Sequence, residues 1–152
     1  QWQNQFYRES VVTMPVRMNE ADRVRGSLRA RVFIADVRYH DGLFCPYCQK
    51  PFEVVPHVDH VVSRKQGGEK KEFDNLLTCC PSCNGRKCDT DVLALFGSDI
   101  HHAVNEQLKN RVLTTADHQA AVDIFYSGST WAERLEMILD WVQLGMLPIR
   151  IK

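Results

Sequence analysis

The sequence of 152 residues lacks any run of about 18 apolar residues, the length that a membrane-spanning helix requires. Its first ten residues, QWQNQFYRES, also lack the basic segment and the apolar core of a secretory signal. We see neither internal repeats nor low-complexity tracts. We therefore expect an intracellular protein, cytoplasmic or associated with the nucleoid, with no membrane segment. The initial Gln leaves open whether the chain is a processed product or part of something longer.

The sequence also lacks a net charge, because 19 Lys and Arg residues balance 19 Asp and Glu residues. A broadly basic surface, which many nucleic-acid-binding proteins use to raise affinity and association rate, is therefore not expected. The charges are unevenly distributed. Residues 1–90 carry 14 basic and 11 acidic side chains, whereas residues 91–152 carry 5 and 8. A phosphate-binding surface is expected in the first part of the chain.

The six cysteines are better interpreted as metal ligands or buried thiols than as disulfides, because no secretory signal accompanies them. Two CxxC pairs, separated by 31 residues, contain four of them: Cys45, Cys48, Cys80 and Cys83. Two such turns brought together supply the tetrahedral set of thiolates that Zn²⁺ favours. The spacing therefore predicts a structural zinc site, with ordinary buried thiols as the alternative. Cys79 is expected in the core, and Cys88 outside the site.

Three regions follow one another along the chain. Residues 1–18 include a β-branched stretch that ends at Pro15, which favours a short strand or an extended arm. Residues 19–90 are expected to form the functional core, and they begin with a helical pattern that should end before Asp41-Gly42. Residues 91–152 are expected to be a helical extension packed on that core, within a single domain overall.

The functional core is expected to be an α+β unit. Residues 52–62 (FEVVPHVDHVV) and 76–79 predict two short strands, and the polar segment between them predicts a loop. A short helix should begin at Pro81 or Ser82. In the extension, Thr130 and Glu133 form a capping-box pattern at the start of the last helix, which should end at Gly145.

Between the zinc half-sites stand DHVVSRKQGG and FDNLLTCCPSCNGRK. The order is a CxxC pair, an acidic residue followed by His, a Gly-bearing loop, an Asn before a short apolar strand, and a second CxxC followed by Asn and Lys. Over roughly residues 28–90 this order resembles the HNH nuclease family. The resemblance implies a ββα-metal finger with a structural four-cysteine zinc site, flanked by an N-terminal helix and several C-terminal helices.

The resemblance also implies a role for each polar residue. Asp59 is similar to the metal-binding acid, His60 to the general base, and Asn75 to the residue that orients the histidine. Asn84 stands where the family name places its last His, as in the HNN branch, and resembles the second metal ligand. Asp59 and Asn84 offer only hard oxygen ligands, which favours Mg²⁺ or Mn²⁺, and a neutral His60 can accept a proton near pH 7.

The predicted function is metal-dependent hydrolysis of phosphodiester bonds in DNA, with RNA as the alternative substrate. By resemblance the products carry a 5′-phosphate and a 3′-hydroxyl. Basic residues around the same element are candidate phosphate contacts: Arg64, Lys65, Lys70, Lys71, Arg86 and Lys87. The alternatives are a zinc-stabilised module that binds nucleic acid or protein with a vestigial site, and an effector subunit of a larger targeting complex. A homodimer is a further arrangement that would permit double-strand cleavage.

Overall fold

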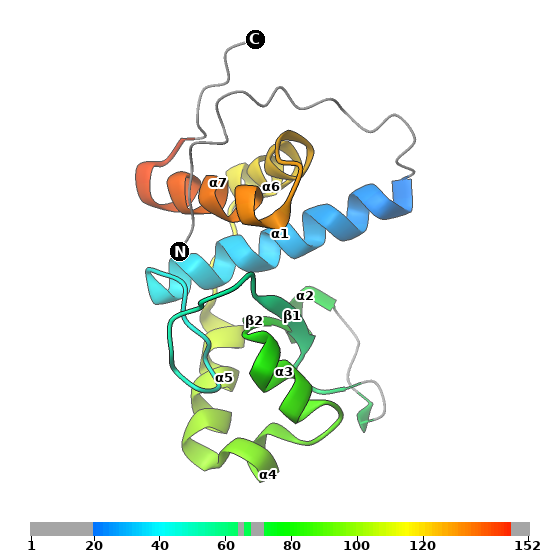
Figure 1. The fold of residues 1–152 in the computed structure, drawn as a ribbon, viewed down its shortest axis with the longest axis vertical. Helices are drawn as coiled ribbons and strands as arrows, with labels where there is room; N and C mark the ends of the chain where they lie inside the picture. The colour runs from blue at the N-terminus through cyan, green and yellow to red at the C-terminus, as the bar shows by residue number, and fades with distance from the viewer. Residues whose placement is uncertain (1–19, 64–65, 68–71, 147–152) are drawn as a thin grey trace. The chain divides into compact units, whose positions relative to one another are not determined.

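The computed structural model describes residues 20–63, 66–67 and 72–146, and the side chains from residue 26 onward. The strand or arm expected within residues 1–18 lies outside these residues. The described elements in chain order are α1 (Glu20–His40), β1 (His57–His60), α2 (Glu72–Asn75), β2 (Leu76–Cys79), α3 (Pro81–Lys87), α4 (Val92–Phe96), α5 (Ser98–Asn110), α6 (Thr115–Ser127) and α7 (Trp131–Leu144) (Figure 1).

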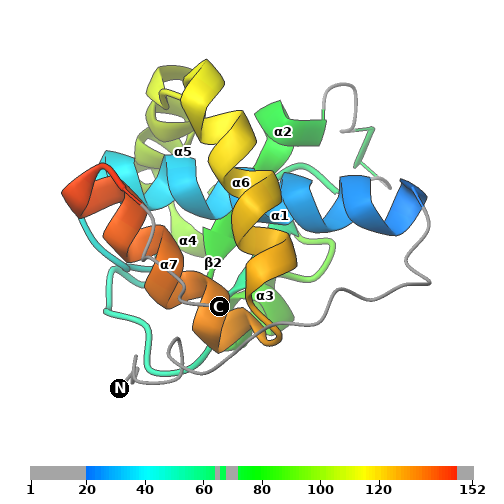
Figure 2. The ribbon, with the colours of Figure 1, turned by 90° about the horizontal axis from the view of Figure 1, so that it is seen from above.

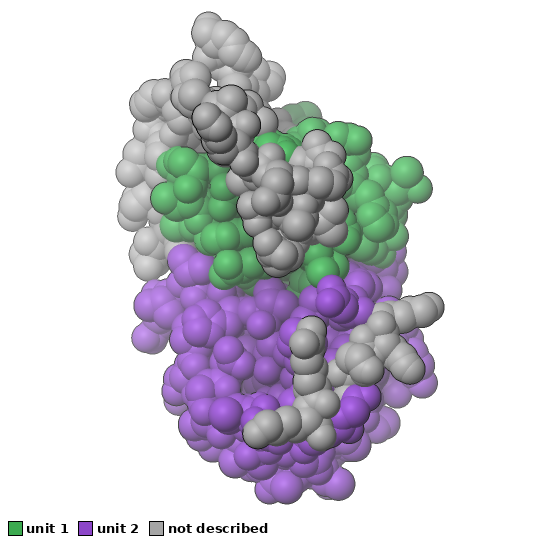
Figure 3. All heavy atoms as spheres, turned by 90° about the vertical axis from the view of Figure 1, so that its right-hand side faces the viewer, with its two compact units in different colours: residues 1–37, 113–152 green, residues 38–112 purple. Residues whose placement is uncertain are grey.

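The chain divides into two compact units, which Figure 3 colours separately. Unit 1 comprises residues 1–37 and 113–152, and unit 2 comprises residues 38–112. Unit 2 thus runs past the boundary expected near residue 90, and it includes α4 and α5. The residues predicted to carry chemistry all lie in unit 2.

Unit 2 is built on a small antiparallel hairpin with helices, the α+β arrangement that the sequence predicts. In the described residues, β1 pairs with β2 in the register His57↔Cys79 to His60↔Leu76. All four β2 side chains are buried, whereas β1 is exposed at His57 and buried at Asp59. The core around β2 combines apolar residues with the cysteines, including Cys45, Val61, Leu77, Cys79, Cys83, Val92 and Val104.

The connection between the strands contains one helical turn that the sequence analysis assigned to a loop. This turn, α2, has acidic residues Glu72 and Asp74 at its start and passes directly into β2 at Leu76. A single turn of helix is unstable by itself. Contacts from Arg111, which donates to the carbonyls of Phe73 and Leu76, hold it in place.

The first helix matches the sequence expectation at both ends, since it starts one residue after Asn19 and ends at His40 before the Asp41-Gly42 turn. Its middle is buried at almost every position, including Val32, Phe33, Ile34 and Ala35. The run from Val32 to Val37 is buried on every side, so this part of α1 belongs to an interior, although the helix also carries several arginines. Gly26 lies so close to Phe125 that an added Cβ would stand 2.1 Å from its ring, which explains a glycine inside a helix.

Within the described part of the chain, no helix is both long and apolar enough to cross a membrane.

In unit 1, α6 and α7 pack against each other (Figure 2). The indole Nε1 of Trp141 donates to Oδ1 of the buried Asp117 at 2.8 Å, which joins the two helices. The capping box predicted for the last helix is confirmed, because the Thr130 hydroxyl accepts from the amide of Glu133 at 3.1 Å and the Glu133 carboxylate accepts from the amide of Thr130. Gly145, with φ 73°, ends α7 as expected.

The Thr130 cap gives a stability prediction. Thr130→Ala removes the acceptor for an otherwise unpaired amide, and we expect the free energy of unfolding to fall by about 1 kcal/mol. Thr115→Ala is the matched control, because Thr115 is the exposed first residue of α6 and not its N-cap. Thermal melting should show a lower midpoint for Thr130→Ala alone. Equal midpoints for both variants would refute the contribution of the cap.

Candidate metal centre and active site

The four cysteines of the two CxxC pairs converge on one point of unit 2. Their ligand atoms all lie within 4.8 Å of one another, and the sulfurs of Cys48 and Cys80 are 4.0 Å apart. Sulfurs at the corners of a tetrahedron around zinc, with bonds of about 2.3 Å, stand about 3.8 Å apart. The cluster therefore fits a structural zinc site, as the spacing predicts.

Each pair of thiols is presented by a tight turn. After Cys45, the amide of Gln49 donates to the Cys45 carbonyl at 2.7 Å, and Gln49 itself has a positive φ of 63°. This folds the chain back so that the amide of Cys45 donates to the Lys50 carbonyl at 3.0 Å. In the second pair, Cys80 is the N-cap of α3, and its sulfur accepts from the amide of Cys83 at 3.4 Å. The four-cysteine cluster therefore includes the start of α3.

The thiols differ in how easily they ionise before a metal binds. Burial raises the pKa of Cys45 to about 11 and raises that of Cys83 as well. Burial also acts to raise the pKa of Cys80, but hydrogen bonds from Cys83 and the neighbouring thiols outweigh it, so this pKa lies below its ordinary value. The lowered pKa favours the thiolate form of Cys80, which is the form that metals bind.

The two remaining cysteines lie where the sequence analysis expected them. Cys79 is fully buried, and burial raises its pKa strongly, which suits a core thiol. Cys88 is exposed at the end of α3 and does not belong to the four-cysteine cluster.

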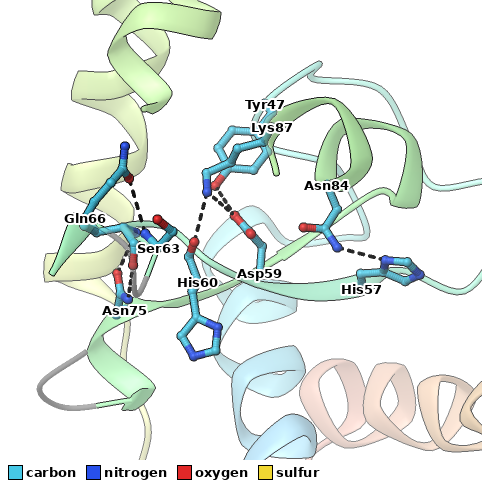
Figure 4. Close-up of polar contacts among 10 residues, drawn as sticks. Tyr47, His57, Asp59, His60, Ser63, Gln66, Asn75, Asn84 and Lys87 are labelled. Atoms are coloured by element: carbon cyan, nitrogen blue, oxygen red, sulfur yellow. Dashed lines mark hydrogen bonds and ion pairs between the residues drawn. The ribbon is translucent and has the colours of Figure 1, made fainter. Parts of the chain in front are cut away.

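Asp59 lies buried on β1 with two partners on the same carboxylate oxygen. The Tyr47 hydroxyl donates to Oδ2 at 2.8 Å, and the ammonium Nζ of Lys87 stands 3.3 Å from Oδ2 (Figure 4). Burial raises the pKa of Asp59, although Tyr47 and Lys87 oppose this effect. Tyr47 belongs to the first CxxC turn and Lys87 to α3, so three parts of unit 2 meet at this carboxylate.

Asn84 reaches from α3 to the exposed end of β1. Its amide Nδ2 lies 3.0 Å from Nδ1 of His57 (Figure 4). Because an amide NH₂ group can only donate, Nδ1 accepts and the Oδ1 of Asn84 stays out of this bond. His57 and Asp59 are two residues apart on a strand and therefore share a face. Asn84 thus lies on the same face of β1 as Asp59.

His60 is the last residue of β1, and its ring points away from the Asp59 side chain (Figure 4). Adjacent residues on a strand face opposite sides, so this orientation follows from the strand geometry. The main chain at this point is held firmly. The Lys87 ammonium donates to the His60 carbonyl at 3.0 Å, and the next amide, of Val61, donates to the Asn75 carbonyl at 2.9 Å.

The side chain of Asn75 forms two hydrogen bonds with the chain just beyond His60. Its side-chain Oδ1 accepts from the amide of Val62 at 3.0 Å, and its Nδ2 donates to the carbonyl of Val62 at 2.9 Å. The side chain of Asn75 thus bonds the main chain two residues after His60 and not the imidazole. Its expected orienting role stays a prediction, and it would act through the backbone.

The expected phosphate contacts have different surroundings. Lys87 is fully buried against Asp59 and the His60 carbonyl, so it does not belong to an exposed basic surface. Arg86 is exposed, lies 5.4 Å from the centre of the Phe96 ring, and lines an open groove together with Lys50. The other four lie outside the described residues: Arg64, Lys65, Lys70 and Lys71.

Sequence reasoning missed three residues that touch the candidate ligands. Tyr47 and His57 have no predicted role in the site, and Lys87 is predicted as a phosphate contact. The i, i+2 spacing of His57 and Asp59 was a usable signal, because residues at that spacing share a face of a strand. No comparable signal indicates the side-chain bonds of Tyr47 and Lys87, which depend on the tertiary fold.

The cysteine cluster gives a second prediction. Cys83→Ser should lower the zinc content and the melting temperature together, because one missing thiolate opens the cage that tethers α3. Cys88→Ser is the control, since Cys88 is an exposed cysteine at the other end of the same helix. Elemental analysis and thermal melting measure both effects. Wild-type protein that contains no zinc, and that a strong chelator does not destabilise, would contradict the prediction.

Comparisons with known proteins agree with this geometry over one segment. Residues 45–90 match the model of the HNH endonuclease family. Neither curated proteins nor solved structures gave a match to the chain. The matched segment contains the four cysteines, both strands and α3, together with the polar residues described above. Residues 45–90 thus match the HNH endonuclease family, and they fold as a ββα unit with a four-cysteine cluster that fits zinc.

Proposed function

We propose that this protein is a metal-dependent endonuclease that hydrolyses phosphodiester bonds of DNA at the site formed by Asp59, His60, Asn75 and Asn84. The HNH family match supports a nuclease function. The observation that carries the proposal is the placement of Asp59 on β1 and Asn84 on α3. Their oxygen-bearing side chains lie on the same face of β1, and each has one polar atom bonded by the protein.

The catalytic metal would be held by Asp59 and Asn84. Oδ2 of Asp59 is bonded by Tyr47 and Lys87, and Nδ2 of Asn84 by His57, which leaves Oδ1 of each residue to face a metal. Two hard oxygens, with the remaining positions filled by water and substrate phosphate, suit Mg²⁺ or Mn²⁺. Such partners behind the ligands fix their orientation, which strengthens metal binding.

His60 is proposed as the general base. A neutral imidazole accepts a proton from the attacking water as the water oxygen bonds to phosphorus and the bond from phosphorus to the 3′-oxygen breaks. The products then carry a 5′-phosphate and a 3′-hydroxyl. Because His60 and Asp59 point to opposite sides of β1, the scissile phosphate has to lie at the end of the strand, where the chain leaves the sheet. When bound, the metal supplies a charge that stabilises the transition state.

Nucleic acid is expected to meet unit 2 beside α3. Arg86 and Lys50 line one groove next to the cysteine cluster, and both are exposed cations that can contact phosphates. The chain as a whole is neutral, so its intrinsic affinity for DNA should be modest. One such site cuts one strand at a time, and supercoiled plasmid should be nicked before it is linearised.

The competing function is a zinc-stabilised binding module in which Asp59 and Lys87 form only a structural ion pair. Both functions are compatible with the cysteine cluster and with the buried pair of Asp59 and Lys87. They differ in activity, since only the endonuclease nicks supercoiled plasmid when Mg²⁺ or Mn²⁺ is added. Plasmid that stays intact with either metal, under conditions where the protein is folded and contains zinc, would favour the binding module.

The third prediction concerns the base. His60→Ala should lower the nicking rate about 10² to 10⁴-fold, the usual effect of removing a general base, while zinc content and melting temperature stay unchanged. His102→Ala is the control, because His102 is an exposed histidine on α5 in the same unit. His57→Ala tests the other histidine on β1. If His57→Ala, and not His60→Ala, removes activity at saturating Mg²⁺, the base has been assigned to the wrong residue.

The fourth prediction separates a metal ligand from a helix residue at Asn84. Asn84→Ala should raise the Mg²⁺ concentration needed for half-maximal nicking, because one oxygen ligand is lost. Asn84→Asp keeps an oxygen in place and adds charge, so its Mg²⁺ requirement should stay equal or fall. Titrating Mg²⁺ against nicking rate compares the two variants with the parent. A curve for Asn84→Ala that overlays the parent curve would exclude Asn84 as a ligand.

A further inference from the structure

Arg111 lies directly after α5 and reaches back to the start of β2. Its Nη1 donates to the Leu76 carbonyl at 2.9 Å, and its Nη2 donates to the Phe73 carbonyl at 2.8 Å. The guanidinium carbon stands 4.3 Å from the centre of the Phe73 ring. These three contacts grip the chain on both sides of Asn75.

The contacts of Arg111 supply hydrogen-bond donors to backbone carbonyls around α2. The last carbonyls of a helix have no partner within it, and α2 is a single turn with no buried side chain of its own. A planar guanidinium with several donors can bond two carbonyls at once, and a positive charge is favourable at a helix C-terminus. The ring of Phe73 adds a cation–π contact that fixes the plane of the guanidinium.

The segment that Arg111 grips is connected to the end of β1 by three hydrogen bonds. The carbonyl of Asn75 accepts from the amide of Val61, and its side chain bonds both the amide and the carbonyl of Val62. On the hairpin, Leu76 is also the cross-strand partner of His60. Arg111 therefore holds the strand opposite His60 and the residue that clasps the chain after it.

We infer that Arg111 is a positioning residue for His60, acting through the Asn75 segment and chiefly through the side chain of Asn75. This inference rests on the proposed role of His60 as the base. Arg111 lies outside residues 45–90, the segment that matches the HNH family, so the chain beyond that segment would contribute indirectly to the active site. Its hydrogen bonds and its ring contact are with Phe73 and Leu76, on either side of Asn75, so we expect its effect to fall on turnover and not on metal binding.

The central test is a double-mutant cycle of Arg111→Lys and Asn75→Ala on plasmid nicking. Lysine keeps the positive charge but cannot bond two carbonyls with a planar fork. Arg111→Lys should lower kcat about tenfold, in the range expected for losing a charge-assisted hydrogen bond. If Arg111 acts through Asn75, the double variant should be no slower than Asn75→Ala. Reductions that multiply would show that Arg111 acts independently and would overturn the inference.

Two further measurements separate positioning from general damage. The Mg²⁺ concentration for half-maximal nicking and the KM for DNA should stay at the parent values in Arg111→Lys, whereas a disordered unit would change both. Millimolar guanidinium should partly restore kcat to Arg111→Ala. Lys109→Met is the charge-loss control, because Lys109 is 69% exposed and only two residues away. If Lys109→Met loses as much kcat as Arg111→Ala, the effect comes from the lost charge and the inference is overturned.

Amide hydrogen exchange tests the grip without relying on catalysis. The amides of Val61 and Val62 both donate to Asn75, so they should exchange faster in Arg111→Lys, while amides in α7 should not change. Phe73→Leu, which removes the ring and leaves the arginine, should have the same effect in weaker form. Unchanged exchange in both variants overturns the inference. If Arg111→Lys exchanges faster but the wild-type protein never nicks DNA, the contacts of Arg111 hold the segment and the proposed function has failed.

Discussion

The register of β1 against β2 is the constraint on which the site in unit 2 depends. The two strands have four residues each, and pairing runs from His57↔Cys79 to His60↔Leu76. A shift by one residue would turn every β1 side chain to the opposite face. Asp59 would then leave Tyr47 and Lys87, and His57 would leave Asn84. So short a hairpin cannot fix its own register by hydrogen bonds alone.

Each end of this hairpin is held by a different device. At one end, Cys79 is followed by Cys80, whose thiol joins the cluster that fits zinc and ties β2 and α3 to the first CxxC turn. At the other end, Asn75 clasps Val61 and Val62, and Arg111 bonds the carbonyls of Phe73 and Leu76. The first device lies within the family segment, and half of the second comes from the chain beyond it.

The sequence predicted those features whose signals are local. The end of α1, the bounds of β2, the start of α3 and the Thr130 cap all follow from turn residues, apolar runs and capping pairs. The four-cysteine cluster was predictable because its spacing is specific. The helical turn α2 was missed because its stabilising contacts come from Arg111, which is 35 residues from Leu76 in sequence. Long-range partners of this kind leave no periodic pattern.

The same reasoning explains why Lys87 was assigned to the surface. Lysine is almost never fully buried unless it is paired, so exposure is the reasonable expectation from sequence. Here its ammonium lies between the Asp59 carboxylate and the His60 carbonyl, and its side chain is fully buried. Whether a lysine of α3 is buried or exposed depends on how α3 crosses β1, and that crossing is set by the tertiary fold.

A buried ion pair is a poor way to stabilise a unit of this size. Desolvating two charges often costs as much as their attraction returns, and well-packed apolar side chains of similar volume would serve stability as well or better. Removing only one partner is the costly change, because it leaves an unpaired charge in the interior. Asp59 and Lys87 therefore have to be retained together, with Tyr47 completing the set of partners on Oδ2. Stability alone does not favour such a set. The proposed role of Asp59 as a metal ligand does favour it, because a carboxylate with one oxygen bonded by the protein has its orientation fixed before the metal ion arrives.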